Sequence, residues 1–474
     1  MEKEMITEKP FFQEAQMPQP QQLPGILRLC CETITNRREY DASVCLAVSC
    51  AIPAYLNRDV RFTFPGDITP QRPTLMGVTV AGFSSGKSYG LGLAQHVLKE
   101  VSETDAVERT KEDAYKEKLL KASKKKEAKI PSKKPFNIRL LSTNTTPPAF
   151  LKRQQDLAKH DAIGVTLMPE IDAFRNFGSG LKGVTELLRN NFDSGELKAE
   201  RVSETSISGC ASLAWSVYAC TTHGQLLDFL AKEIENGLQS RFIFTEIPEE
   251  QAGVATPQFK PFDEKFYNEL SIYTTRLKSM KPGTYEVKEL TAWVERERKR
   301  ITSYATTNGD TITLKLSRRA LLSASRVGFL LWITNGMTWS KEIDRYITTL
   351  YCQSLDLSLR LFGDSLEKIM RISQMYSKKK NIGRPSLLPS LPEIFSLQDL
   401  MEARRKAEYM DADNVNTARE QLKNWAKKKL VRRYEKNRWQ KLTTPTATGP
   451  TSPTTSATGT STPPAAEPTG PFCE

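Results

Sequence analysis

The clearest change in hydrophobic pattern lies between residues 73 and 101. Residues 73–80 are mainly β-branched and apolar, which predicts a buried strand. From Tyr89 onward the apolar residues recur with helical spacing, which predicts a helix with one buried face, at Leu91, Ala94, Val97, Leu98 and Val101. A short run of small residues separates the two segments. The pattern therefore predicts a strand, a tight turn and a helix in direct succession.

The turn reads Ala-Gly-Phe-Ser-Ser-Gly-Lys-Ser and differs from the phosphate-binding pattern G-x-x-x-x-G-K-[ST] only by Ala81 in place of the first glycine. Small residues allow consecutive backbone N–H groups to surround a phosphate. Lys87 then neutralises phosphate charge, and the Ser88 hydroxyl can ligate Mg²⁺. The alternative is a chance Gly/Ser turn. The expected nucleotide-binding residues are Ala81, Gly82, Phe83, Ser84, Ser85, Gly86, Lys87 and Ser88.

Further apolar runs alternate with helical patterns after this loop. Strands are predicted at residues 136–141, 163–168, 213–220 and 241–245, with helices between them. This alternation predicts an α/β fold with a mostly parallel sheet flanked by helices. The core is expected over residues 73–250.

The run at 163–168 ends in Pro169-Glu170-Ile171-Asp172. Phosphoryl transfer with Mg²⁺ needs acidic groups near the phosphate loop, one to hold the hydrated metal and another to polarise the attacking water. Glu170 and Asp172 are candidates for both roles, and they would share a side if the strand continued past 168. The alternative is an ordinary pair of helix-capping acids.

Two polar positions near the later strands complete the catalytic candidates. Thr222 follows the 213–220 strand, where it could sense a terminal phosphate, or it could simply cap the next helix. Arg241 opens the last strand. It could anchor a carboxylate locally or reach a phosphate as an arginine finger, in the same chain or from a neighbouring subunit.

The C-terminal pattern is helix, helix and basic hairpin over residues 393–442, which predicts a winged-helix domain. Its basic residues favour DNA contact, with protein contact as the alternative. The DNA-binding candidates are Arg419, Lys423, Lys427, Arg432, Arg433, Lys436 and Arg438.

The remaining segments flank these two regions. A lysine-rich insertion at 105–135 is expected to be a solvated helix or loop, with a phosphate-tracking arm as the sharper alternative. The other expected segments are a flexible arm at 1–24, an N-terminal helical segment at 25–72, a helical subdomain at 251–377, a linker at 378–392 and a disordered Thr/Pro/Ser tail at 443–474.

Composition narrows the function classes. The 474 residues carry a formal net charge of +13, which makes an anionic partner plausible. The amino end lacks the apolar core of a signal peptide, and the longest apolar window is too short to span a bilayer, so a cytoplasmic location without membrane contact is expected. The eight cysteines form no C-x-x-C pair, which disfavours a zinc site or a disulfide framework.

Several stretches together resemble a family of P-loop ATPases of bacterial plasmids, phages and conjugative elements, often found beside primase-like domains. The matching stretches are 38–41, 81–88, 169–174, 222–225 and 235–244. The resemblance implies a RecA-like ATPase core that uses ATP and Mg²⁺, with phosphate binding at Lys87 and Ser88. It also implies acidic catalysis at Glu170 and Asp172 and a functional Arg241.

The expected function is ATP hydrolysis coupled to DNA, as a helicase or helicase loader in replication or maintenance of a mobile element. Homo-oligomers, including a hexameric ring, and a primase-like partner fit this expectation. A different class is also open: a nucleotide-gated scaffold or defence switch that turns over slowly and recruits a protein partner.

Overall fold

The computed structural model of the chain describes residues 16–125, 135–176, 180–199, 208–230, 233–234, 236–249, 257–381, 387–407, 412–435 and 437–442. The chain forms two compact units, Met1–Ser373 and Gln374–Glu474. Most of the expected N-terminal arm and the expected tail at 443–474 lie outside the described residues. Leu23 is buried, so the folded part begins slightly before residue 25.

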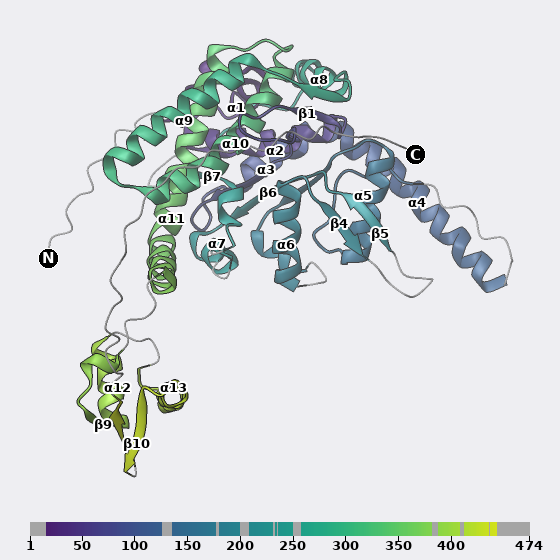
Figure 1. Cartoon of the computed structure of the whole chain (residues 1–474). Coiled ribbons are helices and arrows are strands. Elements are labelled where there is room, and N and C mark those ends of the chain that lie inside the picture. Colours follow the sequence, from purple (N-terminus) through teal and green to yellow (C-terminus); the bar gives the residue numbers. More distant parts are fainter. Residues whose placement is uncertain are drawn as a thin grey trace, which may run out of the picture. The chain divides into compact units, whose positions relative to one another are not determined.

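A four-stranded parallel sheet forms the centre of the first unit (Figure 1). Its strands are β2 (Met76–Val80), β3 (Gly164–Met168), β6 (Trp215–Thr221) and β7 (Ile243–Glu246), in the spatial order β3-β6-β2-β7. All five residues of β2 and all seven of β6 are buried, as their unbroken apolar pattern requires. A single parallel bridge from Leu140 to Val165 extends the order beyond β3, where a full strand was predicted at 136–141.

The N-terminal helices support this sheet. α1 (Gly25–Cys31) leads to α2 (Asp41–Ala51), and every residue of α2 is buried against the sheet and α3 (Ser88–Val97). A Cβ added to Gly77 in β2 would lie 2.7 Å from Cys50 Sγ, so a glycine lets α2 approach the strand closely. β1 (Val60–Phe62) pairs in parallel with the distant β8 (Gly283–Tyr285), a pairing that the local pattern did not predict.

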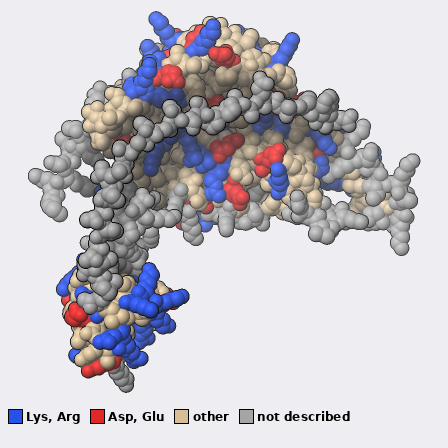
Figure 2. All heavy atoms as spheres, in the orientation of Figure 1, with Lys and Arg blue, Asp and Glu red and all other residues tan. Residues whose placement is uncertain are grey.

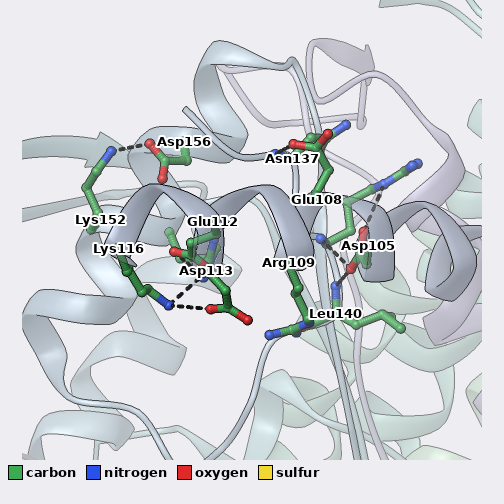
Figure 3. Close-up of polar contacts among 12 residues, drawn as sticks. Asp105, Glu108, Arg109, Glu112, Asp113, Lys116, Asn137, Leu140, Lys152 and Asp156 are labelled. Atoms are coloured by element: carbon green, nitrogen blue, oxygen red, sulfur yellow. Dashed lines mark hydrogen bonds and ion pairs between the residues drawn. The ribbon is translucent and has the colours of Figure 1, made fainter. Parts of the chain in front are cut away.

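The lysine-rich insertion is largely helical in the described part of the chain. α4 (Lys99–Lys125) extends from the body of the unit (Figure 1). Its first half is fixed by polar contacts (Figure 3): Asp105 accepts hydrogen bonds from the backbone N–H groups of Arg139 and Leu140, and Glu112 pairs with Arg153 at 3.0 Å. Residues 126–134 of the expected insertion lie outside the described residues.

Helices also surround the sheet on the C-terminal side of the unit. Phe244 of β7 donates its backbone N–H to Ser354 Oγ, which lies on one of these helices and satisfies a free strand edge. The remaining elements of the unit are α5 (Pro147–Lys159), α6 (Gly180–Phe192), the hairpin β4 (Glu196–Ala199) and β5 (Gly209–Ser212), α7 (His223–Leu230), α8 (Glu264–Lys278), α9 (Lys288–Asn308), α10 (Thr311–Thr334) and α11 (Lys341–Asn381). Short 3-10 turns lie at Pro20–Gln22, Arg38–Tyr40, Ile52–Tyr55, Ile171–Asn176 and Gln239–Arg241.

The second unit is a small α/β module with its own apolar core. After a 3-10 turn at Leu388–Ser390, its elements are β9 (Ile394–Ser396), α12 (Leu397–Lys406), α13 (Val415–Lys427), β10 (Val431–Glu435) and β11 (Arg438–Lys441). The strands form an antiparallel sheet in the order β10-β11-β9, and the core includes Phe395, Leu400, Leu422 and Trp425. Ser396 and Asp399 form a capping box at the start of α12. The two helices and the hairpin match the predicted pattern, and β9 is an additional strand.

Candidate nucleotide site

Residues 81–87 form the turn between β2 and α3, at the carboxyl edge of the sheet. The turn is closed by backbone hydrogen bonds from Ala81 to the Thr221 carbonyl at 3.0 Å and from Tyr89 to the Gly86 carbonyl at 3.0 Å. Ser85 Oγ donates to the Gly82 carbonyl at 2.8 Å. The expected phosphate-binding residues therefore lie in one compact turn that opens a helix, the local geometry that favours an anion.

Gly86 has a physical reason to be glycine. Its φ is +70°, and an added Cβ would lie 2.4 Å from the ring of Tyr89 and 2.9 Å from Tyr40 Oη. Ser84 also adopts positive φ at 55°. The left-handed backbone at Ser84 and at Gly86, with Ser85 between them, lets the turn bend sharply, as turns that bind anions through backbone N–H groups do.

Lys87 forms an ion pair with an acid that follows a different strand. Its Nζ lies 2.7 Å from Glu170 Oε1, although β6 separates β2 from β3 in the sheet. The Lys87 side chain is 18% exposed and that of Glu170 is 40% exposed, so both stay open to solvent. Glu170 Oε2 is buried and has no hydrogen-bond partner among the described residues. The structure thus brings together the predicted lysine and one of the two predicted acids.

Asp172 has a different neighbour. The strand does not continue past Met168: Pro169 lacks an N–H for the ladder, and a 3-10 turn begins at Ile171. The condition for Glu170 and Asp172 to share a side is therefore not met. Asp172 Oδ1 instead accepts a hydrogen bond from Arg175 at 3.1 Å.

Thr222 lies at the end of β6 and behaves as a helix cap. Its Oγ1 accepts the backbone N–H of Gln225 at 3.4 Å, within the first turn of α7. It still lies at the carboxyl edge, because the preceding residue Thr221 pairs with Val80. The contacts of Thr222 are thus those expected of a helix cap.

A polar chain at the same edge went unrecognised in the sequence. His223 Nε2 lies 2.8 Å from Glu246 Oε1 at the end of β7, and Arg360 of α11 lies 2.7 Å from Glu246 Oε2. Burial raises the pKa of Glu246, but the hydrogen bonds from Arg360 and His223 outweigh it and hold that pKa below its usual range. The signal available in the sequence was an acid at the end of the last core strand, by analogy with Glu170.

Arg241 lies at the opposite edge of the sheet from Lys87. It precedes β7, whose parallel register with β2 places its amino end beside Gly77 and its carboxyl end beside Val80. The buried guanidinium donates to Asp193 Oδ2 at 2.8 Å and to the Gly237 carbonyl at 3.1 Å. An arginine finger stays an untested prediction. The contacts are those of the local anchor.

The described residues suit a magnesium ion only together with a phosphate. They contain no group of three or more His, Cys, Asp or Glu side chains that could hold a metal. Ser88 is exposed and follows Lys87 in the chain, and Glu170, which contacts Lys87, has an Oε2 without a hydrogen-bond partner among the described residues. A few oxygen ligands, supplemented by substrate phosphates and water, are the usual protein contribution to a Mg²⁺ site.

The second unit carries the predicted basic residues on its surface, and Figure 2 shows Lys and Arg side chains gathered there. Arg419, Lys423 and Lys427 are exposed along α13, on the side away from the buried Ala418, Leu422 and Trp425. In the hairpin, Arg433 and Arg438 are exposed, and Arg432 donates to Gln440 Oε1 at 2.8 Å. Adjacent Arg432 and Arg433 face opposite sides of the strand, so they cannot share one surface. Lys436 lies outside the described residues.

Comparison with known proteins does not assign this chain to a family. Within the described parts, no helix is both long and apolar enough to traverse a lipid bilayer. No protein-family model matches the sequence, and no curated protein matches it either.

Proposed function

We propose that this protein is a Mg²⁺-dependent ATPase with a RecA-like core that acts on DNA. The observation that carries the proposal is the 2.7 Å contact between Lys87 and Glu170. It joins the loop that follows β2 to the segment that follows β3. In the sheet, β6 lies between these two strands. This strand order and the acid at the end of β3 support the RecA-like interpretation.

The chemistry follows from the positions of these groups. The backbone amides of residues 82–88 would hold the phosphates at the amino end of α3, where the helix dipole also favours an anion. Lys87 would exchange its bond to Glu170 for a bond to phosphate oxygens. Glu170 would then be free to orient a water molecule for in-line attack. Ser88 would hold Mg²⁺ together with the phosphates, with Glu170 nearby, and the bound ion would supply the charge that neutralises the phosphates.

DNA is the proposed partner because of the second unit. Exposed cations at intervals of four residues along α13, on a helix whose other side is buried, suit a helix that follows phosphates or enters a major groove. The two-helix and hairpin arrangement supports the winged-helix interpretation. A helicase or a helicase loader of a mobile element combines both activities, and a homo-oligomeric ring would fit it.

Steady-state hydrolysis with and without DNA tests the proposal. We expect ATP turnover that requires Mg²⁺, is stimulated by single-stranded or duplex DNA, and disappears in the Lys87→Ala variant. Turnover in Lys87→Ala equal to that of the unmodified chain would remove the enzymatic assignment.

The DNA assignment has its own test. Replacing Lys423 and Lys427 together with glutamine should reduce the slope of log affinity against log salt by about 2, because about one counterion is released per phosphate contact. The matched control replaces Lys265 and Lys281, which are exposed in the first unit. Equal slopes in the two double variants would place the DNA contact elsewhere.

A slow nucleotide switch is the second candidate, and the same ion pair favours it. Glu170 must leave Lys87 before it can orient water, so the pair stabilises an inactive arrangement. Tight ATP binding with negligible turnover, unchanged by DNA, would support the switch over the DNA-stimulated ATPase.

A further inference from the structure

Three aromatic side chains lie beside the phosphate loop and play no part in the proposed hydrolysis. The rings of Tyr40 and Tyr89 meet edge to face with centroids 4.9 Å apart, and those of Tyr89 and Phe259 lie 5.0 Å apart at 59°. Tyr89 directly follows Ser88, and its ring covers Gly86 so closely that no Cβ would fit there. The cluster is therefore part of the wall of the loop.

Exposure rises along this cluster. Tyr40 is buried, Tyr89 is half-buried, and Phe259 is 43% exposed. An aromatic ring with an open face next to a polar loop costs free energy in water, because apolar surface stays hydrated. The cluster thus ends in a partly exposed ring, Phe259, that packs on Tyr89 beside the phosphate loop.

Phe259 is held firmly by backbone pairing with a distant segment. It bridges Ile34, while Thr35 donates its N–H to the Gln258 carbonyl at 3.0 Å and Lys260 donates to the Thr33 carbonyl at 2.8 Å. Asn36 Oδ1 also accepts the N–H of Gln258 at 2.8 Å. A ring fixed on both sides along the backbone loses little entropy when a ligand stacks on it.

The position suits the base of a nucleotide. Glu170 approaches Lys87 from the end of β3, whereas Phe259 packs on Tyr89 of α3 and pairs with Ile34, so different elements hold the acid and the ring. A nucleoside triphosphate whose terminal phosphate lies near Glu170 must extend its base away from that acid. We propose that Tyr89 and Phe259 form the platform on which the purine base of the nucleotide stacks.

This inference rests on the proposed function, since it needs a triphosphate in the loop. It also gives a role to the Arg-Glu-Tyr-Asp stretch at 38–41, whose Tyr40 packs edge to face against Tyr89. A large π surface favours purines over pyrimidines through stacking area, and stacking reads no hydrogen-bond pattern. ATP and GTP should therefore bind more tightly than UTP.

Calorimetric binding to the full chain separates the base from the phosphates. Mg-ATP should bind Phe259→Ala about tenfold more weakly than the unmodified protein, as expected for the loss of one stacked base. Inorganic tripolyphosphate, which has no base, should bind the two proteins equally. Phe259→Trp should retain tight ATP binding. Ile272→Ala is the matched control, since Ile272 is an apolar residue of α8, outside the phosphate loop, and is 51% exposed.

The results distinguish a failure of the stacking platform from a failure of the triphosphate site. Equal ATP affinity in Phe259→Ala and the unmodified chain would overturn the platform, and so would an equal loss for ATP and tripolyphosphate. If the unmodified protein binds neither ligand, the platform and the proposed ATPase fall together. If it binds both, the triphosphate site on which the proposed ATPase depends stands whatever the Phe259 variants show.

Discussion

Charged residues at the two edges of the central sheet differ in their exposure and in their partners. At the carboxyl edge, Lys87 and Glu170 share one short contact, stay partly exposed, and leave Glu170 Oε2 without a hydrogen-bond partner among the described residues. At the amino edge, Arg241, Arg319 and Arg326 donate to backbone carbonyls and neighbouring side chains. Cations alone therefore do not locate a site. The carboxyl edge differs in that the Lys87–Glu170 pair stays partly exposed, whereas Arg241 and Arg326 are buried.

Arg326 is the extreme case at the amino edge. It is 1% exposed, and it donates to the carbonyls of Thr74 and Phe192 and to Gln71 Oε1, with its guanidinium 4.2 Å from the centre of the Phe192 ring. Burial lowers its pKa to about 10, so it still carries its charge at neutral pH. Such a cation joins α10, α6 and the approach to β2, and its burial keeps it from a solvent-borne ligand, although its Nε has no hydrogen-bond partner among the described residues.

Substitution of an acid at the carboxyl edge should have the largest effect. Glu170→Gln keeps the shape of the side chain and removes its charge, so we expect hydrolysis to fall by about a hundredfold or more, the usual contribution of a group that acts on water. ATP binding should persist. Asp172→Asn is the matched control, because Asp172 contacts Arg175 rather than Lys87, and it should lose much less activity. Equal losses in both variants would show that the ion pair does not identify the catalytic acid.

A variant at the amino edge should affect folding and leave catalysis intact. Arg241→Gln removes the donors to Asp193 and to Gly237, and we expect the free energy of unfolding to fall by about 1–3 kcal/mol. Turnover per folded molecule should stay within about twofold of normal, since the contribution of Arg241 is structural by this account. Denaturant unfolding and turnover at matched folded concentration check the two quantities. A large loss of turnover with unchanged stability would instead support a finger that acts on a neighbouring subunit.

The smallest expected effect concerns a buried acid beside the carboxyl edge. Burial raises the pKa of Asp41 from 3.8 to about 6, although Arg38 partly opposes this. The folded state therefore binds the proton more tightly than the unfolded state. The resulting stabilisation is complete below about pH 4 and is lost as pH rises through 6.

Unfolding measured between pH 4 and pH 7 tests this titration. The loss of stability with rising pH should be reduced in Asp41→Asn, whose amide does not titrate. Other groups common to both proteins cancel in the difference between the two curves. Parallel curves for the two proteins would contradict the assignment.

Local patterns predicted the parts of the fold that depend on near neighbours. Residues 73–101 contain the strand, turn and helix in one continuous stretch, so small residues and apolar spacing sufficed to predict them. The capping box at Ser396 and the two helices of the second unit are also local features. The same reasoning predicted Lys87 and Glu170 as separate candidates, without their contact.

Features that depend on pairing across the chain were not predictable in this way. Arg241 was expected at the start of a strand, but its distance from Lys87 follows from the parallel register of β7 with β2, which the sequence does not state. Phe259 gained a fixed position only through pairing with residues 33–35, more than 220 positions earlier. The polar chain of His223, Glu246 and Arg360 likewise joins three separate elements.

Nucleotide binding to the unmodified chain and to Lys87→Ala is the most direct test of the central claim, that the carboxyl edge is a triphosphate site. Titration calorimetry with Mg-ATP should show saturable binding to the unmodified protein and a loss of about a hundredfold or more in the variant, because a charged hydrogen bond to phosphate is removed. Arg241→Gln should bind ATP normally. Equal binding by the unmodified protein and Lys87→Ala, or no binding by either, would contradict the account.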